Sequence, residues 1–173
     1  PDTIFEQVKK LCPGTILRFR LQPDNGQKRR ECFSYWSIKE SYQKGIADPV
    51  TDFSQAKAEL KAILQKSVKS RMEADVPLGT FLSGGYDSSL MTAMAQEASE
   101  APVKTFSIGF EEKQYDESGY ALAVAKHLGT QHTEEIISEK QMLELVESIP
   151  QYFDEPMADS SEIPTMLVSA LAR

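Results

Sequence analysis

The sequence predicts an α/β protein built around a parallel β-sheet. Segments with helical spacing alternate with short, largely apolar segments between residues 53 and 173, which is the pattern of parallel strands joined by crossover helices. The apolar segment at 76–82 ends in Ser83-Gly84-Gly85 before a new helical pattern begins. A buried strand, a glycine turn and a helix therefore follow one another directly.

Residues 1–40 predict a small antiparallel element in front of that sheet, after an opening helix end or turn. Residues 15–21 alternate as a half-buried strand, residues 23–26 (Pro-Asp-Asn-Gly) have the chemistry of a hairpin turn, and a second strand runs back over 28–36. A lone two-stranded hairpin is only marginally stable in water. We therefore expect residues 1–40 to be the end of a larger domain, and residues 41–52 to be a linker.

The expected elements after the linker are, in chain order, a helix over 53–72, a strand over 76–82, a helix over 88–98, a strand over 103–110, a helix over 116–128, a strand over 132–137, a helix over 138–149 and a final helix from 160 or 161. Helical spacing gives the first two helices an apolar face. The residues of these faces are Leu60, Ile63, Leu64, Val68 and Met72, and then Leu90, Met91, Met94 and Ala98. Gly129 is expected to end the third helix, and Ser138 with Gln141 to form a capping box.

The composition argues against several classes of partner. The formal net charge is −7 at pH 7, which disfavours a nucleic-acid backbone or an anionic membrane surface. No apolar stretch has membrane-spanning length, and no signal pattern opens the chain. Cys12 and Cys32 fit a disulfide or two reduced, partly buried thiols, and a cytoplasmic location favours the thiols. His127 and His132 are expected to be structural.

The loop at 83–89 has the composition of an anion-binding site. Its glycines let the backbone approach a ligand closely, and the unpaired N–H groups of the next helical turn point towards that ligand. Asp87 adds a carboxylate, which can lie beside a phosphate only with a cation between them, and Mg²⁺ is the usual one. The lysine of GxxxxGK[ST] and the GxGxxG pattern are both absent. The predicted site comprises Ser83, Gly84, Gly85, Asp87, Ser88 and Ser89.

This Ser-Gly-Gly-X-Asp-Ser loop resembles the pyrophosphate loop of the ATP-pyrophosphatase superfamily, whose members adenylate a carboxylate or carbonyl oxygen and release pyrophosphate. The flanking segments resemble, more narrowly, the glutamine-hydrolysing asparagine synthetases. These segments are Val76–Ser89, Thr105-Phe-Ser-Ile-Gly-Phe110, His127-Leu-Gly-Thr130 and Asp154–Thr165, with Leu11–Phe19 and Tyr35-Trp36 similar to the end of the family's glutaminase domain. The resemblance implies the Rossmann-like fold of the ATP-pyrophosphatases.

The resemblance also implies a reaction and a set of small-molecule substrates. In the family, ATP reacts with the side-chain carboxylate of aspartate to form β-aspartyl-AMP, and ammonia released from glutamine then displaces AMP. Carried over to this sequence, pyrophosphate and Mg²⁺ fall on the loop at 83–89, with Asp87 as the metal ligand. The backbone at Phe81, Leu82 and Ile108 is expected to hold adenine and ribose.

On the same basis, residues 1–40 are the tail of a glutaminase domain and residues 53–173 the first half of the ATP-binding synthetase domain. The family's glutaminase nucleophile is an N-terminal cysteine, whereas Pro1 stands here and Cys12 is not equivalent. The family also continues into a further strand and a second, acidic glycine-rich loop. We therefore expect half of an ATP site and no glutamine hydrolysis. Self-association, such as a homo-oligomer, is expected because the helix faces at 53–73 and 161–173 lack neighbours.

Two alternatives stay open. The parent enzyme could act on another acid, as lactam synthetases and surface-polysaccharide amidotransferases do, because the acid pocket is expected outside this sequence. The chain could also serve only as a nucleotide-binding module.

Overall fold

The computed structural model describes residues 2–21, 28–114, 116–156 and 159–173. It divides into two compact units, Pro1–Ala56 and Lys57–Arg173, which are described separately. The hairpin turn expected at 23–26 lies outside the described residues. No helix in the described ranges is long and apolar enough to cross a membrane.

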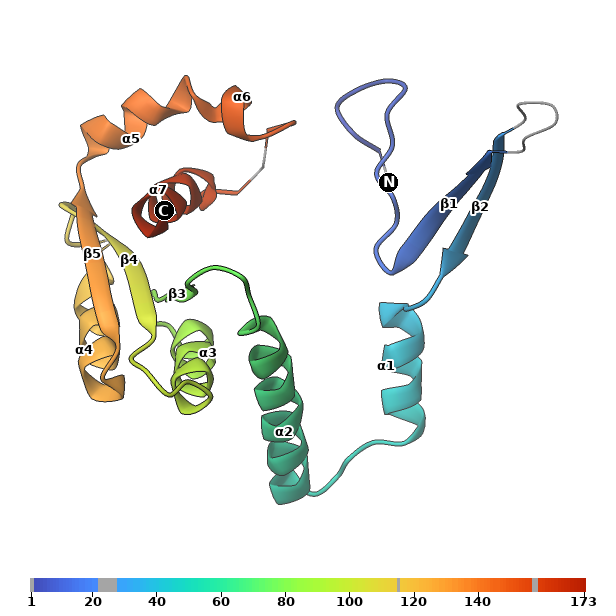
Figure 1. The fold of residues 1–173 in the computed structure, drawn as a ribbon, viewed down its shortest axis with the longest axis horizontal. Helices are drawn as coiled ribbons and strands as arrows, with labels where there is room; N and C mark the ends of the chain where they lie inside the picture. Colours follow the sequence, from blue (N-terminus) through green and yellow to red (C-terminus); the bar gives the residue numbers. More distant parts are fainter. Residues whose placement is uncertain (1, 22–27, 115, 157–158) are drawn as a thin grey trace. The chain divides into compact units, whose positions relative to one another are not determined.

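The first unit contains the expected hairpin and an additional helix (Figure 1). Strands β1 (Thr15–Leu21) and β2 (Lys28–Ser34) pair antiparallel, with Thr15 opposite Ser34. Helix α1 (Ile38–Ala47) then occupies most of the segment that was expected to be a linker. The physical reason is local, because the Ser37 hydroxyl caps the helix by accepting the N–H of Glu40.

The cysteines of this unit are two free thiols. Cys12 and Cys32 are both exposed, which corrects the expectation of partly buried thiols. Cys32 lies in β2 opposite Leu17, at a position where the hairpin is open to solvent.

The second unit is the expected α/β structure (Figure 1). After α2, whose first turn precedes the unit boundary, its three strands form one parallel sheet in the order β3-β4-β5. This sheet confirms the prediction of an α/β structure with a parallel sheet. The elements are α2 (Phe53–Arg71), β3 (Gly79–Phe81), α3 (Tyr86–Glu97), β4 (Lys104–Phe110), α4 (Ser118–Leu128), β5 (Gln131–Ile137), α5 (Glu139–Val146), α6 (Ile149–Tyr152) and α7 (Glu162–Ala172).

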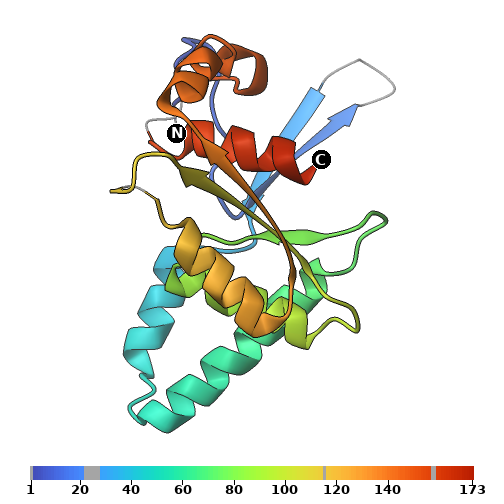
Figure 2. The same cartoon turned by 90° about the vertical axis from the view of Figure 1, so that its left-hand side faces the viewer.

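Helices cover both faces of the sheet (Figure 2). Helices α3 and α4 lie against one face and α7 lies against the other. The central strand β4 reflects this arrangement, because Thr105 and Ser107 are buried while Phe106 and Ile108, which alternate with them, are half-buried. A Cβ added at Gly109 would lie 2.8 Å from the Cβ of Ser118 in α4, so the buried set faces α4.

The hydrophobic core beneath β3 is small and well defined. Leu82, immediately after β3, packs with Ala121 and Ala125 of α4, and each of the three is 1% exposed. Full burial of a leucine side chain contributes about 1.5–3 kcal/mol to stability. The alanines let α4 approach the strand end closely, and the loop that follows Leu82 is thereby held near the start of α4.

Three details differ from the expectations. Strand β3 has 3 residues rather than the whole of 76–82, and Phe81 is 50% exposed. Within the described chain β3 pairs only with β4, so one edge remains open and the strand is not fully buried. Helix α3 begins at Tyr86, two residues earlier than expected.

The buried faces of α2 and α3 also differ from those expected from the sequence. In α3, Thr92, Met94 and Ala95 are buried, whereas Leu90 is 44% exposed. The Thr92 hydroxyl lies 3.0 Å from that of Thr80 in β3, and this contact turns Thr92 towards the sheet. Helix α2 has no buried residue, and its Ile63 is 65% exposed.

The helix ends follow the predicted signals. Gly129 follows α4 with φ 69°, in the left-handed region, and its N–H donates to the carbonyl of Ala125. Ser138 and Gln141 form the expected capping box, since the N–H of Gln141 donates to Ser138 Oγ and the N–H of Ser138 to Gln141 Oε1.

Two glycine substitutions in and after α4 should have opposite effects on stability. Gly129→Ala places a Cβ in the left-handed region without meeting any neighbour, so it should lower the free energy of unfolding by about 1–2 kcal/mol. Gly119→Ala lies inside α4 in open space and should raise it by about 0.5–1 kcal/mol. Urea denaturation followed by circular dichroism measures both, and a Gly129→Ala variant that is as stable as the unaltered chain would contradict the assignment of Gly129 as the helix terminator.

Candidate functional site

The backbone of the 83–85 turn passes very close to the start of α4. Gly84 has φ 81°, and a Cβ at this position would lie 2.6 Å from the backbone nitrogen of Ala121 and 2.6 Å from the Cβ of Tyr120. Only glycine fits here, because both the conformation and the space exclude a side chain. The close contact between Gly84 and α4 therefore fixes the place at the edge of the sheet where α3 begins.

The N-terminus of α3 is open towards solvent. Gly85 is the N-cap residue and provides no side-chain cap. The N–H groups of the first helical turn, from Tyr86 to Ser88, have no acceptor within the helix. Such a helix end carries a partial positive charge and attracts anions.

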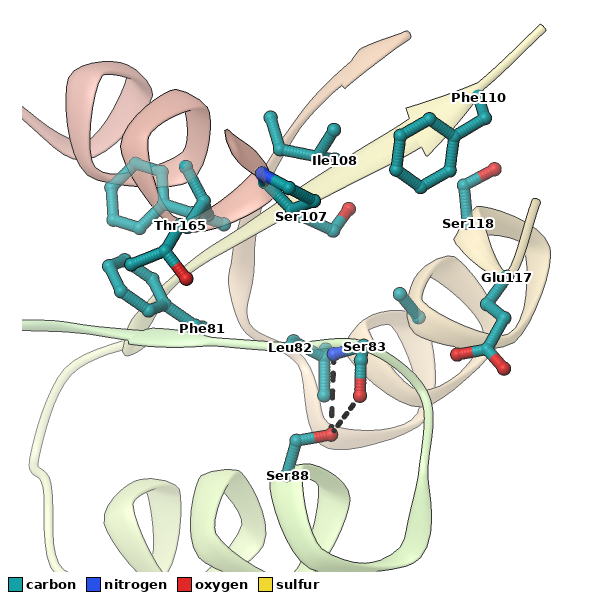
Figure 3. A pocket seen from close by; sticks show the side chains of 14 residues that line it. Phe81, Leu82, Ser83, Ser88, Ser107, Ile108, Phe110, Glu117, Ser118 and Thr165 are labelled. Atoms are coloured by element: carbon teal, nitrogen blue, oxygen red, sulfur yellow. Dashed lines mark hydrogen bonds between the residues drawn. The ribbon is translucent and has the colours of Figure 1, made fainter. Parts of the chain in front are cut away.

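Hydrogen bonds between Ser83 and Ser88 link the two ends of the turn (Figure 3). Ser88 Oγ accepts the N–H of Ser83 at 3.2 Å and lies 2.9 Å from Ser83 Oγ. The Ser88 hydroxyl donates to the carbonyl of Gly85 at 3.2 Å, and the N–H of Gly85 donates to Ser83 Oγ at 3.3 Å. The loop therefore has a defined curvature without a ligand.

A pocket of about 380 Å³ lies beside this loop, at the carboxyl ends of β3 and β4 (Figure 3). Small-molecule sites span roughly 300–1,000 Å³, and ligands of open parallel sheets bind at this edge. The wall comes from the ends of β3 and β4, the N-terminus of α4 and the first turns of α7. The predicted site residues that line the pocket are Phe81, Leu82, Ser83, Ser88 and Ile108.

The other predicted residues lie in the loop and helix rather than in the pocket wall. Asp87 is exposed in the first turn of α3, where a carboxylate also suits the helix dipole. Ser89 Oγ is buried and has no hydrogen-bond partner in the described ranges. The backbone N–H of Leu82 donates to the carbonyl of Phe106 at 2.9 Å, so this amide is not available to a ligand.

The structure adds pocket residues that the sequence analysis did not select. Glu117 and Ser118 come from the start of α4, Phe110 from the end of β4, and Thr165 from α7. The order of elements contained a signal for the first two, because a helix that follows a parallel strand begins at that strand's carboxyl end. Thr165 ends the Asp154–Thr165 segment that carries the family resemblance, but nothing in that segment indicated a place in the pocket.

Asp116 fixes the position of the α4 N-terminus. Its Oδ1 accepts the N–H of Ser118 at 3.1 Å and the N–H of Phe110 at 3.3 Å. The Ser118 hydroxyl and N–H lower the pKa of Asp116 below its ordinary value, and the N–H of Phe110 acts in the same direction. The charged carboxylate thus joins the last residue of β4 to the first turn of α4.

These groups suit a phosphorylated ligand more than a resident metal ion. The described residues contain no cluster of three or more His, Cys, Asp or Glu side chains that could hold a metal. Asp87 lies in the loop at 83–89, and Glu117 lies in the pocket wall. Mg²⁺ commonly binds through one or two carboxylates together with substrate phosphates, and a single loop carboxylate fits that mode.

The two loop glycines should respond very differently to a methyl group. Gly84→Ala combines a positive φ with contacts of 2.6 Å to α4, so we expect a loss of roughly 2–5 kcal/mol in the free energy of unfolding. Gly85→Ala meets only Ser83 Oγ, at 3.4 Å, and should change stability by less than about 1 kcal/mol. Thermal and urea unfolding compare the pair, and a well-tolerated Gly84→Ala would disprove the close approach.

Comparison with known proteins gives the family. The Asparagine synthase family profile matches residues 59–173. A Methanocaldococcus jannaschii protein provisionally named glutamine-hydrolysing asparagine synthetase 2 is 37% identical over 174 residues, covering 100% of this chain and 32% of the relative. Bacillus subtilis glutamine-hydrolysing asparagine synthetase 1 is 33% identical over 174 residues, covering 100% of this chain and 26% of the relative.

A more distant relative is the glutamine-hydrolysing asparagine synthetase of Gallus gallus, 27% identical over 158 residues, with 85% of this chain and 28% of that protein covered. The chain therefore spans only 26–32% of the length of these relatives. The family profile nevertheless covers more than half of the chain, including the whole parallel sheet, the loop and the pocket. The chain belongs to the asparagine synthase family.

Proposed function

We propose that residues 57–173 form the pyrophosphate-binding half of an ATP site. The observation that carries this proposal is the combination of an open helix N-terminus, a glycine that brings the backbone close to α4, and a pocket beside them at the strand ends. The triphosphate would lie on the N–H groups and hydroxyls of the loop, and the base and ribose in the pocket. Carbonyl groups at Phe81 and Leu82 and the backbone of Ile108 are among the polar groups available to them, together with the side chains of Ser107, Glu117, Ser118 and Thr165.

The chemical role of this half would be to stabilise the leaving group. A substrate carboxylate oxygen attacks the α-phosphorus of ATP, the bond from that phosphorus to the bridging oxygen breaks, and pyrophosphate leaves with the electron pair. Backbone N–H groups aimed at the growing negative charge lower the barrier of such a step. Mg²⁺ at Asp87 and the phosphate oxygens would neutralise part of the same charge.

For the whole protein we propose the reaction named in its relatives, glutamine-dependent asparagine synthesis. Aspartate would supply the attacking carboxylate, and β-aspartyl-AMP would be the intermediate. Ammonia from glutamine would attack the acyl carbon, break the bond to AMP and lose a proton. The proposal of aspartate as the acid rests on the names of the relatives.

We further propose that residues 1–40 are the end of a glutaminase domain and that 53–173 begin the synthetase domain. Two findings support this division. The family profile starts at residue 59, whereas the named relatives match over the whole chain. The hairpin also belongs to a compact unit of its own. A cytoplasmic location and a homo-oligomeric state stay predictions.

A titration with Mg-ATP tests the nucleotide site directly. We expect weak binding by the chain, about tenfold weaker binding for Asp87→Asn because the cation loses its carboxylate, and unchanged binding for Asp75→Asn. Asp75 is exposed and lies before β3, so it is a matched control for the loss of one negative charge. Isothermal titration calorimetry with and without Mg²⁺ provides the measurement. Equal heats for Asp87→Asn and the unaltered chain would contradict a role of the loop in nucleotide binding.

The acid substrate is tested in a full-length protein that contains this chain. ATP, Mg²⁺ and aspartate should yield asparagine, AMP and pyrophosphate with either ammonia or glutamine. Product analysis by mass spectrometry distinguishes the candidates. AMP formation without asparagine, but with amidation or cyclisation of another acid, would favour a lactam synthetase or a polysaccharide amidotransferase, and nucleotide binding without any AMP would leave only a binding module.

A further inference from the structure

His132 lies between two hydroxyl groups of the neighbouring strand. It is the second residue of β5 and pairs with Thr105 of β4, so both side chains point to the α4 side of the sheet. His132 Nδ1 is 2.9 Å from Thr105 Oγ1, and His132 Nε2 is 3.2 Å from Ser107 Oγ. Thr105 is 0% exposed, so water does not compete for its hydroxyl, whereas Ser107 keeps a small exposed surface of 4%.

The contacts continue into α4 and give the network a direction. Thr105 Oγ1 lies 3.0 Å from Thr130 Oγ1, and the Thr130 hydroxyl donates to the carbonyl of Ala125. With the Thr130 proton on this 3.4 Å contact to Ala125, Thr130 Oγ1 accepts from Thr105. Thr105 Oγ1 in turn accepts from His132, which requires a proton on Nδ1 of the neutral ring. His132 Nε2 is then an acceptor, and the Ser107 hydroxyl donates to it.

This direction has a consequence for the pocket. Ser107 lines the candidate nucleotide pocket, between Phe106 and Ile108 (Figure 3). If its only proton is held by Nε2, the Ser107 oxygen can offer nothing but lone pairs to a ligand. His132 is not among the lining residues, so any effect it has on a ligand acts through the hydroxyl of Ser107.

We propose that His132 is a positioning residue that turns Ser107 into a pure hydrogen-bond acceptor in the pocket wall, where it receives a hydroxyl or amino group of the nucleotide. The ligand part of this inference rests on the proposed function. The opposite proton direction, with Nε2 carrying the hydrogen, leaves the Ser107 proton free to donate and turns the Thr130 hydroxyl towards Thr105, while the Ala125 carbonyl keeps the N–H groups of Gly129 and Thr130 as donors. The two directions therefore differ in which ring nitrogen of His132, Nδ1 or Nε2, carries the proton.

Nuclear magnetic resonance decides the tautomer without any ligand. The chain has 2 histidines, so a long-range ¹H–¹⁵N spectrum contains only two ring systems. We expect His132 to show a protonated Nδ1 and an unprotonated Nε2. His127 is exposed in the last turn of α4 and provides the internal control, with averaged signals. Ser107→Ala should shift the Nε2 resonance of His132 alone, and a protonated Nε2 would overturn the proposal.

Binding measurements with a matched pair of variants test the effect on the ligand. His132→Gln places an amide oxygen near the former Nε2 and can still accept the Ser107 proton, whereas His132→Asn reaches only as far as Nδ1. We expect His132→Asn to weaken Mg-ATP binding about threefold to tenfold, as for the loss of one hydrogen bond, and His132→Gln to retain most of the affinity. In a Ser107→Ala background the two variants should bind equally.

The possible outcomes distinguish failure of the His132 positioning role from failure of the proposed ATP site. Equal affinity of His132→Asn and the unaltered chain would reject the positioning role while the ATP site stands. The same loss in the Ser107→Ala background would show that His132 acts by supporting the fold, which also rejects it. Absence of Mg-ATP binding by the unaltered chain would reject the proposed function and the ligand role together, and the tautomer assignment would still be decided by the spectra.

Discussion

The close approach of two backbones at Gly84 governs the arrangement of the site. The loop after β3 can reach the N-terminus of α4 only because no side chain intervenes at this position. Leu82 is buried against two alanines of α4 directly beneath. The loop, the start of α3 and the start of α4 are thereby held at one edge of the sheet, and the helix N-terminus that could meet an anion faces the same edge as the pocket.

The face of β4 that packs on α4 is polar, although it is buried. A buried hydroxyl without a partner costs about 1–3 kcal/mol, so each such group needs a hydrogen bond. Thr105 and Ser107 obtain theirs from His132, and Thr92 obtains one from Thr80. These bonds join neighbouring elements at the strands, whereas the apolar face of β4 packs on α7. Polar contacts of this kind fix register and rotamer more strictly than apolar packing does, because they depend on distance and angle.

The candidate pocket lies within the part of the chain that the family profile matches. The geometry points to an anion at the start of α3 and a flat or apolar group between the strand ends and α7. The family profile covers all of these elements. Within the described chain both outer strands of the sheet, β3 and β5, have one open edge, and α2 has no buried residue.

The sequence by itself determined the order of strands and helices, the capping signals and the loop, because these depend on near neighbours in the chain. The spacing of apolar residues, the glycine past the end of α4 and the Ser138–Gln141 pair act over three or four residues. Local reasoning did not predict α1, because its polar residues suggested only a linker and the Ser37 cap was not recognised. The tertiary structure decided which face of α3 is buried, how short β3 is, and that Glu117, Ser118 and Thr165 share a pocket with the loop. It alone placed His132 against Thr105 and Ser107, because strand register joins residues more than twenty positions apart, and no local pattern encodes that pairing.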